Sequence, residues 1–361
     1  MININGEITI FCGTDYGDEG KGKALTSYIK KKRPDLTIRY NGGPNAGHSV
    51  LKDNGAHYKL HQIPSSVAYQ EMGLIGPGCV LDIKKLYKEI EEFKKVEGFD
   101  PLDYLLIHPE VSLIEEKHLT LDSHYHAKKQ GSTSSGIAPA YSDYYNRIAK
   151  LVKESSLNTH VLKDVYEVQN VLLEGAQGFY LNPHSGNYPY TTSSSCHPGA
   201  AAMTLNFDVT KIKNVIGVAK CYSTRSGYDP TFMNTFENGR FLEEKINFTN
   251  QDMTNFETLQ EFGKEFGVTT GRKRAVRYLC LERLINSTKS MGCNIVLINK
   301  WDILELTKIF KLVVKDEIMS FSNSITMFNF VENALKHFCP KVKTVIYSDT
   351  PYSNIPWEKY V

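Results

Sequence analysis

A glycine-rich loop near the N-terminus restricts the fold of this 361-residue chain more than any other part of its sequence. Residues 7–13 alternate and are rich in β-forming types, which predicts a strand. Residues 22–32, at the far end of the loop, continue as a predicted helix. A strand, a loop and a helix in this order point backbone N–H groups and the positive end of a helix dipole at an anion. The sequence therefore predicts a phosphate-binding loop.

The loop itself departs from the usual phosphate-binding pattern. The stretch Gly17–Lys23 has the spacing G-x-x-x-x-G-K, but Ala24 occupies the position where Ser or Thr would hold magnesium. Two carboxylates, Asp18 and Glu19, lie where phosphates are expected. A carboxylate here can hold the metal instead, or it can accept a proton from a substrate that lies over the phosphates. The remaining interpretation is a charged surface turn.

Further apolar strands that end in glycine turns or polar loops follow along the chain. They occupy residues 36–43, 168–178, 215–227 and 294–304. Strands that alternate with helices favour an α/β fold with a mostly parallel central sheet flanked by helices, similar to P-loop NTPases. Functional loops should lie at the carboxyl ends of those strands. Because no clean linker is visible, residues 1–361 are predicted to form one elaborated domain.

Composition argues against several classes of protein. The 42 Lys and Arg residues almost balance the 40 Asp and Glu residues, so bulk charge does not favour a nucleic-acid partner. No apolar run approaches ~18 residues, so no membrane span is predicted. The seven cysteines are odd in number and include no C-x-x-C pair, which favours a reducing cytoplasm over a disulfide framework or a zinc site.

The loop at residues 41–50, NGGPNAGHSV, follows a predicted strand and carries Asn45 and His48. A histidine in such a loop can donate a hydrogen bond to an oxygen that develops negative charge. The alternative is a histidine that is merely solvated.

The stretch INKWDIL, residues 298–304, contains N-K-x-D after an apolar strand. Asp302 could accept both N1–H and N2–H of guanine, which adenine does not offer, and the Lys300 stem could cover the base. A four-residue match also arises by chance, so its position after a buried strand is what favours a guanine site.

The stretch GVTTGRKRAVR, residues 267–277, carries Lys273 and three arginines behind two threonines and a glycine. Forked guanidinium groups suit bidentate binding of a carboxylate or phosphate. A nucleic-acid surface is the other interpretation, but the hydroxyls and the glycine turn favour a small anion.

In their order, these motifs and three others make the chain resemble the adenylosuccinate synthetase family. The motifs are GTDYGDEGKGK, NGGPNAGHSV, HQIPSSV, EGAQG, YPYTTSS, TTGRKR and NKWD. The length is similar to the short form of the family, typical of archaea and some phages. The resemblance implies a ligase that joins L-aspartate to C6 of inosine monophosphate (IMP), with GTP and Mg²⁺, through a 6-phosphoryl intermediate.

The resemblance also implies roles for individual residues. Asp18 would remove the N1 proton of the purine and contact Mg²⁺, and His48 would stabilise charge on the phosphoryl group. Gly47 would offer its carbonyl oxygen to Mg²⁺. Arg147 would reach the nucleotide of a partner subunit, so a homodimer is implied. The remaining residues would bind the GTP phosphates (Gly20, Lys21, Gly22), guanine (Lys300, Asp302), the purine monophosphate (Asn45, Thr133, Gln177, Thr192) and aspartate (Thr270, Arg272, Arg274).

Departures from the family pattern leave alternatives open. Asp15 stands where the family usually has Gln, TTSSSCHPG alters the run beside the purine site, and AVRYLC alters the support of the arginine loop. Some phage relatives use dGMP, at times with ATP, and many have Ser at the position of Asp18. Asp18 therefore favours IMP, while the altered run keeps dGMP open. A GTP-dependent switch is the alternative from another class; it would not need TTGRKR or NAGH, and Ala24 lacks the hydroxyl that such switches use.

Overall fold

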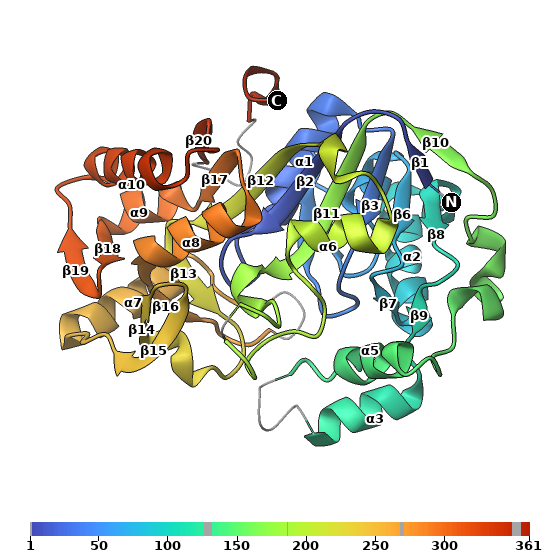
Figure 1. Cartoon of the computed structure of the whole chain (residues 1–361), viewed down its shortest axis with the longest axis horizontal. Helices are drawn as coiled ribbons and strands as arrows, with labels where there is room; N and C mark the ends of the chain where they lie inside the picture. Colours follow the sequence, from blue (N-terminus) through green and yellow to red (C-terminus); the bar gives the residue numbers. More distant parts are fainter. Residues whose placement is uncertain (1, 126–131, 186, 268–270, 349–354) are drawn as a thin grey trace.

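The computed structural model describes residues 2–125, 132–185, 187–267, 271–348 and 355–361. Its main element is an eight-stranded sheet with the order β20-β17-β12-β2-β11-β3-β6-β8 (Figure 1). Every neighbouring pair in this sheet is parallel, which confirms the predicted parallel central sheet. In chain order, its strands are β2 (Ile8–Gly13), β3 (Leu36–Arg39), β6 (Gly73–Ile75), β8 (Leu105–Ile107), β11 (Val171–Gly178), β12 (Ile212–Lys220), β17 (Ile295–Asn299) and β20 (Thr344–Tyr347).

Smaller sheets surround the central one. The second sheet joins β13 (Tyr222–Arg225), β16 (Ala275–Cys280), β18 (Lys311–Val314) and β19 (Glu317–Ser320). The remaining strands pair in twos: β1 (Ile2–Ile4) with β10 (Tyr166–Val168), β4 (His48–Leu51) with β5 (His57–Leu60), β7 (Val80–Leu81) with β9 (Ser112–Leu113), and β14 (Asn234–Glu237) with β15 (Arg240–Lys245).

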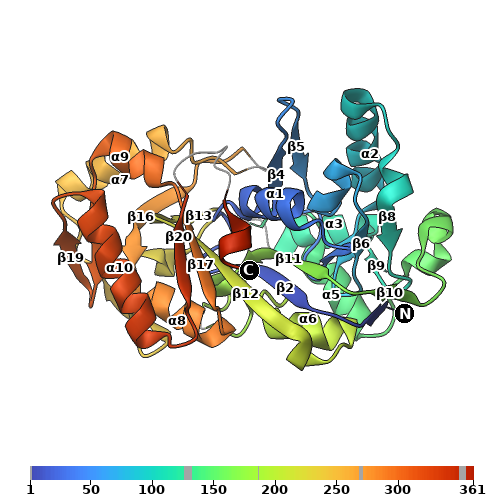
Figure 2. The same cartoon turned by 90° about the horizontal axis from the view of Figure 1, so that it is seen from above.

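Helices cover both faces of the central sheet, with α1 on one side and α6 on the other (Figure 2). None of the helices in the described part of the chain is long and apolar enough to cross a membrane. The α-helices are α1 (Lys21–Lys32), α2 (Ile83–Glu97), α3 (Glu116–Tyr125), α5 (Ile137–Tyr145), α6 (Pro198–Leu205), α7 (Asn250–Phe262), α8 (Leu281–Met291), α9 (Trp301–Thr307) and α10 (Ser324–Phe338).

The core follows from the burial of the central strands. All residues of β2 and β17 are buried, as expected for strands covered by helices on both faces. The C-terminal segment adds to this core, because Trp357 is fully buried and its indole N–H donates to Ser27 Oγ at 3.1 Å. The ring also packs edge-on against Phe11 and Tyr28. The last residues therefore fasten α1 to the sheet.

The parallel order brings functional loops together. Strands β12, β2, β11 and β3 are neighbours, so their carboxyl ends meet at one edge of the sheet. The loops that leave this edge carry the glycine-rich loop, the NAGH loop, the EGAQG turn and the STRSG stretch. Ligands in open α/β sheets bind at such an edge.

Candidate active site

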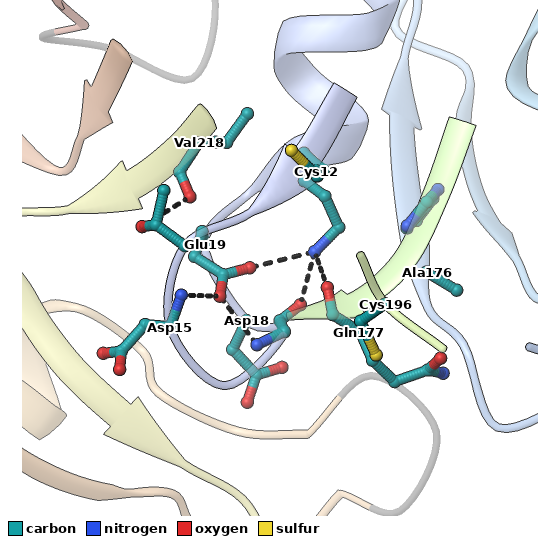
Figure 3. A network of polar contacts seen from close by, with 12 residues as sticks. Cys12, Asp15, Asp18, Glu19, Ala176, Gln177, Cys196 and Val218 are labelled. Carbon is teal, nitrogen blue, oxygen red and sulfur yellow. Dashed lines mark hydrogen bonds and ion pairs between the residues drawn. The ribbon is translucent and has the colours of Figure 1, made fainter. Parts of the chain in front are cut away.

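The two carboxylates of the glycine-rich loop point in different directions. Glu19 is turned into the loop, whereas Asp18 points away from it (Figure 3). Glu19 Oε1 accepts from the backbone N–H groups of Asp15 (3.0 Å) and Gly17 (2.7 Å). Its Oε2 accepts from Lys21 Nζ at 2.9 Å, and both side chains are buried. Glu19 therefore closes the loop on itself.

Lys21 lies beneath the loop. Besides Glu19, its ammonium group donates to the carbonyl oxygens of Gly17 (3.1 Å) and Gln177 (2.6 Å). These contacts account for its three donors. The structure thus gives Lys21 the role of tying the loop to β11, and phosphate binding by its side chain stays a prediction.

Gly20 and Gly22, the two loop glycines predicted to bind phosphate, are required for different structural reasons. Gly20 precedes α1 with φ 82°, a left-handed conformation that favours glycine. Gly22 lies against β4, and a Cβ at this position would meet the Ser49 carbonyl oxygen at 2.5 Å. Gly22 therefore allows α1 to approach the β4 backbone, a reason that the sequence alone did not reveal.

Asp18 lies at the border between the loop and a cavity of about 480 Å³, whose volume is in the usual range for small-molecule sites. Its Oδ1 forms an ion pair with Arg274 Nη2 at 2.9 Å, and its Oδ2 accepts from Ser226 Oγ at 2.9 Å. The side chain is 20% exposed. Asp18 is therefore accessible to a ligand, with one cation and one hydroxyl already bound.

His48 begins β4 and lines the same cavity. Its Nδ1 contacts Glu174 Oε1, and the side chain is buried. Burial lowers the pKa of His48 to about 4, although Glu174 opposes this shift. Glu174 also accepts from the N–H and the hydroxyl of Ser65, both at 2.9 Å, and lies 3.6 Å from Arg39 Nη1.

These contacts set the protonation of the pair. Burial alone raises the pKa of Glu174, but His48, Arg39 and Ser65 outweigh burial and hold that pKa at about 2. An ionised carboxylate only accepts hydrogen bonds, so Nδ1 of His48 carries the proton of the neutral ring. Nε2 is then the nitrogen available to a ligand.

Four polar side chains assigned to the purine nucleotide line this cavity: Asn45, Thr133, Gln177 and Thr192. Asn45 Oδ1 is buried and has no hydrogen-bond partner among the described residues. Asp122 shapes the loop that carries Thr133, because it accepts from Ser132 Oγ and from the Gly136 N–H, both at 2.8 Å. Gly47, assigned to Mg²⁺, lines the cavity as well. The structure therefore brings these assigned residues together.

The arginine loop reaches the cavity from the other side. Arg272 lines it, together with Gly267. Gly267 N–H donates to the Arg272 carbonyl at 2.8 Å, and Arg274 N–H donates to the Glu265 carbonyl at 3.0 Å, so the loop returns on itself. The Arg274 side chain is buried against Asp18 and Glu265. Thr270 lies outside the described residues.

The NKWD segment runs from Asn299, the last residue of β17, into α9, and it contacts the glycine-rich loop. Lys300 precedes α9 with φ 72°, and its Nζ donates to the Gly263 carbonyl at 2.8 Å. Asp302 lies in the first turn of α9 and is partly exposed. Asn299 Nδ2 donates to the Glu19 carbonyl at 2.7 Å. This contact joins the NKWD segment to the glycine-rich loop.

Arg147 lies apart from these residues. It follows α5 with φ 64°, is exposed, and is not among the residues that line the cavity. An arginine that acts on a partner subunit would have to be exposed, so its assigned role stays a prediction.

The chain is similar to known proteins over most of its length. A family model described as adenylosuccinate synthetase matches residues 10–161 and 144–346. The adenylosuccinate synthetase of Methanococcus aeolicus is 35% identical over 283 residues, which cover 75% of this chain and 77% of the relative. That of Caldanaerobacter subterraneus subsp. tengcongensis is 32% identical over 355 residues, which cover 82% of this chain and 78% of the relative.

The chain belongs to the adenylosuccinate synthetase family. It is a ligase of purine biosynthesis that forms a C–N bond.

Solved structures show the same fold. A fully ligated adenylosuccinate synthetase from Plasmodium falciparum matches with a TM-score of 0.75 and 24% identity, over 96% of this chain and 98% of that one. The succinoaminodeoxyadenylate synthetase (PurZ) of cyanophage S-2L, bound to dGMP and dATP, matches with a TM-score of 0.69 and 17% identity, over 97% and 94%.

Three site residues of this synthetase were missed by motif analysis. Glu174 was noted only as part of a glycine turn, although it contacts His48 from 126 residues away. Arg225 and Ser226 line the cavity, and Ser226 binds Asp18. The signal was present in the sequence, since STRSG follows a buried strand and carries a cation and three hydroxyls.

Two of the departures from the family pattern involve residues that are not among those lining the cavity, Asp15 and the Ser195–Cys196 pair. Ser195 Oγ donates to Asn182 Oδ1 at 3.0 Å, and the Cys196 N–H donates to the same oxygen at 3.0 Å. Neither residue is among those that line the cavity. Asp15 is buried, and burial raises the pKa of its carboxyl to about 6, while Arg283 opposes that shift.

Proposed function

We propose that this protein joins L-aspartate to C6 of IMP with GTP as phosphoryl donor, which gives adenylosuccinate. One observation carries the proposal: Asp18, His48 and Arg272 line a single cavity, together with the polar side chains assigned to the purine. A base, a phosphoryl-stabilising group and a carboxylate-binding cation are the groups this reaction requires.

In the proposed first step, Asp18 accepts the N1 proton of IMP, and the 6-oxygen attacks the γ-phosphate of GTP, which releases GDP. His48 takes up a second proton when the anionic phosphoryl group lies at Nε2, because a nearby negative charge favours the imidazolium form. Nε2–H then donates to a phosphoryl oxygen. The contact with Glu174 keeps the ring in the orientation for this donation.

In the proposed second step, the amino group of aspartate attacks C6, and inorganic phosphate leaves with the former 6-oxygen. Arg272 holds a carboxylate of aspartate, since a guanidinium group binds a carboxylate with two parallel hydrogen bonds. Arg274 is close enough to Asp18 to contribute to the same site once a ligand replaces that contact.

Magnesium fits the oxygen atoms present in the cavity. Mg²⁺ prefers oxygen ligands and is often held by one or two protein groups together with substrate phosphates. The Asp18 carboxylate and the Gly47 carbonyl are such groups, and both residues line the cavity. No cluster of three or more His, Cys, Asp or Glu side chains suited to a metal exists within the described ranges. Bound Mg²⁺ would neutralise charge on the phosphates.

The proposal extends to the assembly of the protein. We infer a homodimer in which Arg147 reaches the purine nucleotide of the neighbouring subunit. Support comes from the exposure of Arg147 and from the exposed apolar side chains of Tyr145 and Ile148 on either side of it.

The discriminating experiment measures aspartate-dependent phosphate release with IMP, GMP and dGMP, each combined with GTP and ATP. We expect the highest kcat/KM with IMP and GTP. A 2-amino group would crowd the loop that carries Asp18, a kind of selection worth about 10–200-fold. A higher kcat/KM for dGMP would assign the enzyme to the alternative reaction, and phosphate release without any purine would contradict the proposal.

A further inference from the structure

One buried carboxylate, Glu265, connects loops that the proposed function assigns to two different substrates. Glu265 lies three residues after α7 and is 1% exposed. Its Oε2 accepts from Lys220 Nζ at 3.0 Å and from Arg274 Nη1 at 2.7 Å. Its Oε1 accepts from Tyr222 O–H at 2.8 Å and lies 4.0 Å from Lys300 Nζ.

Every group around this carboxylate is a donor or a cation. Burial alone raises the pKa of Glu265, but Lys220, Arg274 and Lys300 outweigh burial and hold that pKa at about 2. An ionised carboxylate accepts on both oxygens, which matches these donors. An amide would turn its own N–H₂ group toward one set of donors and leave them unpaired.

The neighbours of Glu265 lead to both sides of the reaction. Arg274 uses its other nitrogen, Nη2, to bind Asp18 at 2.9 Å, so this arm reaches the catalytic cavity. Lys300 donates to the carbonyl of Gly263, two residues before Glu265, so this arm reaches the NKWD segment. Glu265 and its segment therefore hold the side chains of two functional cations, Arg274 and Lys300.

We propose that Glu265 is a positioning residue that sets Arg274 for aspartate and Lys300 for the donor base, so one carboxylate supports recognition of both substrates. This inference rests on the proposed function, which assigns aspartate to the arginine loop and guanine to NKWD. The purine monophosphate contacts neither cation in that assignment. Loss of the carboxylate should then affect two of the three substrates.

The test is Glu265→Gln in the full chain, with KM measured separately for aspartate, GTP and the purine monophosphate. We expect the KM for aspartate to rise about tenfold or more and the preference for GTP over ATP to fall by a similar factor, since an unpaired buried group weakens an interaction by about that much. The KM for the purine should stay within about twofold. Glu261→Gln, an exposed residue four positions earlier, is the matched control and should change none of these constants.

A second variant keeps the test valid if Glu265→Gln fails to fold. Tyr222→Phe removes one donor to Oε1, the oxygen that faces Lys300, and leaves the carboxylate in place. It should change the KM for GTP by a few-fold and leave the KM for aspartate unchanged. Equal changes of all three KM values, or none, in these variants would overturn the inference. Absence of aspartate-dependent phosphate release by the wild type would instead contradict the proposed function itself.

Discussion

The surroundings of His48 and of Asp18 differ, although both side chains line one cavity. His48 is buried and already oriented by Glu174, which is held in turn by Ser65 and Arg39. Asp18 is 20% exposed, and Arg274 and Ser226 occupy its two oxygens. In the proposed mechanism, the ring of His48 acts without rearrangement, whereas Asp18 accepts a proton only after a ligand has replaced its contacts with Arg274 and Ser226. His48 is therefore already oriented in this structure, whereas Asp18 is held by contacts that a substrate would have to displace.

The largest expected effect comes from removing the proposed proton acceptor, the partly exposed carboxylate of Asp18. Asp18→Asn keeps the shape of the side chain but cannot take the N1 proton, so we expect kcat to fall about 10²–10⁴-fold. Binding of the purine, measured by calorimetry, should weaken only a few-fold. Ser226→Ala is the control, because it removes a partner of Asp18 and leaves the carboxylate. Retention of more than about a tenth of wild-type kcat would exclude Asp18 as the base.

The corresponding change beside the buried His48 is Glu174→Gln. The amide can accept from Nδ1–H, but it can also donate to Nδ1 and so stabilise the opposite tautomer. We expect kcat to fall roughly 10²-fold with little change in the KM values, within the range attributed to positioned acid–base groups. Ser65→Ala, which removes one donor to Glu174, should cost much less. Equal losses in the two variants would mean that Glu174 serves the fold and not His48.

Arg272→Leu tests the cation that already faces the cavity. We expect the KM for aspartate to rise about 10–150-fold, the cost of losing a charge-assisted hydrogen bond to a carboxylate. Donor binding should hardly change. Lys273→Leu, the exposed neighbour that is not among the residues lining the cavity, is the control. An unchanged KM for aspartate together with lost GTP binding would show that the arginine loop binds the donor.

Asp302→Asn tests whether the NKWD segment reads guanine. The carboxylate can accept two donors from guanine, and an amide would turn one N–H group against another, at a cost of about 1–3 kcal/mol. The ratio of kcat/KM for GTP over ATP should fall by roughly 5–150-fold. Glu305→Gln, in the same helix α9, is the control. A wild-type enzyme that uses ATP as well as GTP would already contradict this role.

The last expected effect is on stability and not on activity, and it reports the burial of His48. Its pKa is about 4 in the folded protein against an ordinary value of 6.5, so the unfolded chain binds more protons between these two pH values. This contribution to stability is therefore complete above pH 6.5 and is lost as the pH falls toward 4. Urea unfolding should show that the free energy of unfolding falls less between pH 6.5 and pH 4 for His48→Asn than for the wild type, by at most roughly 3 kcal/mol. His57→Asn, on the exposed face of β5, should follow the wild type.

The sequence by itself determined the local units and their chemistry. The strand, loop and helix around Gly17–Lys23 and the parallel sheet follow from periodicity, glycine placement and residue type, and the anion-binding character of several loops stays a prediction. A few neighbouring residues fix each strand, loop and helix, and the alternation of strands with helices along the chain predicts the parallel sheet. For the same reason, the motif set sufficed to assign the family.

The resemblance assigned Asp18 as the base, but only the tertiary structure explains why Asp18, and not the adjacent Glu19, faces the cavity. Glu19 turns inward because Lys21 and the loop N–H groups bind it, which leaves Asp18 for the cavity. The pairing of His48 with Glu174 and the sharing of Glu265 between two loops were equally beyond the sequence. Side-chain direction depends on partners that the fold brings together from distant positions, and a linear pattern does not record those distances.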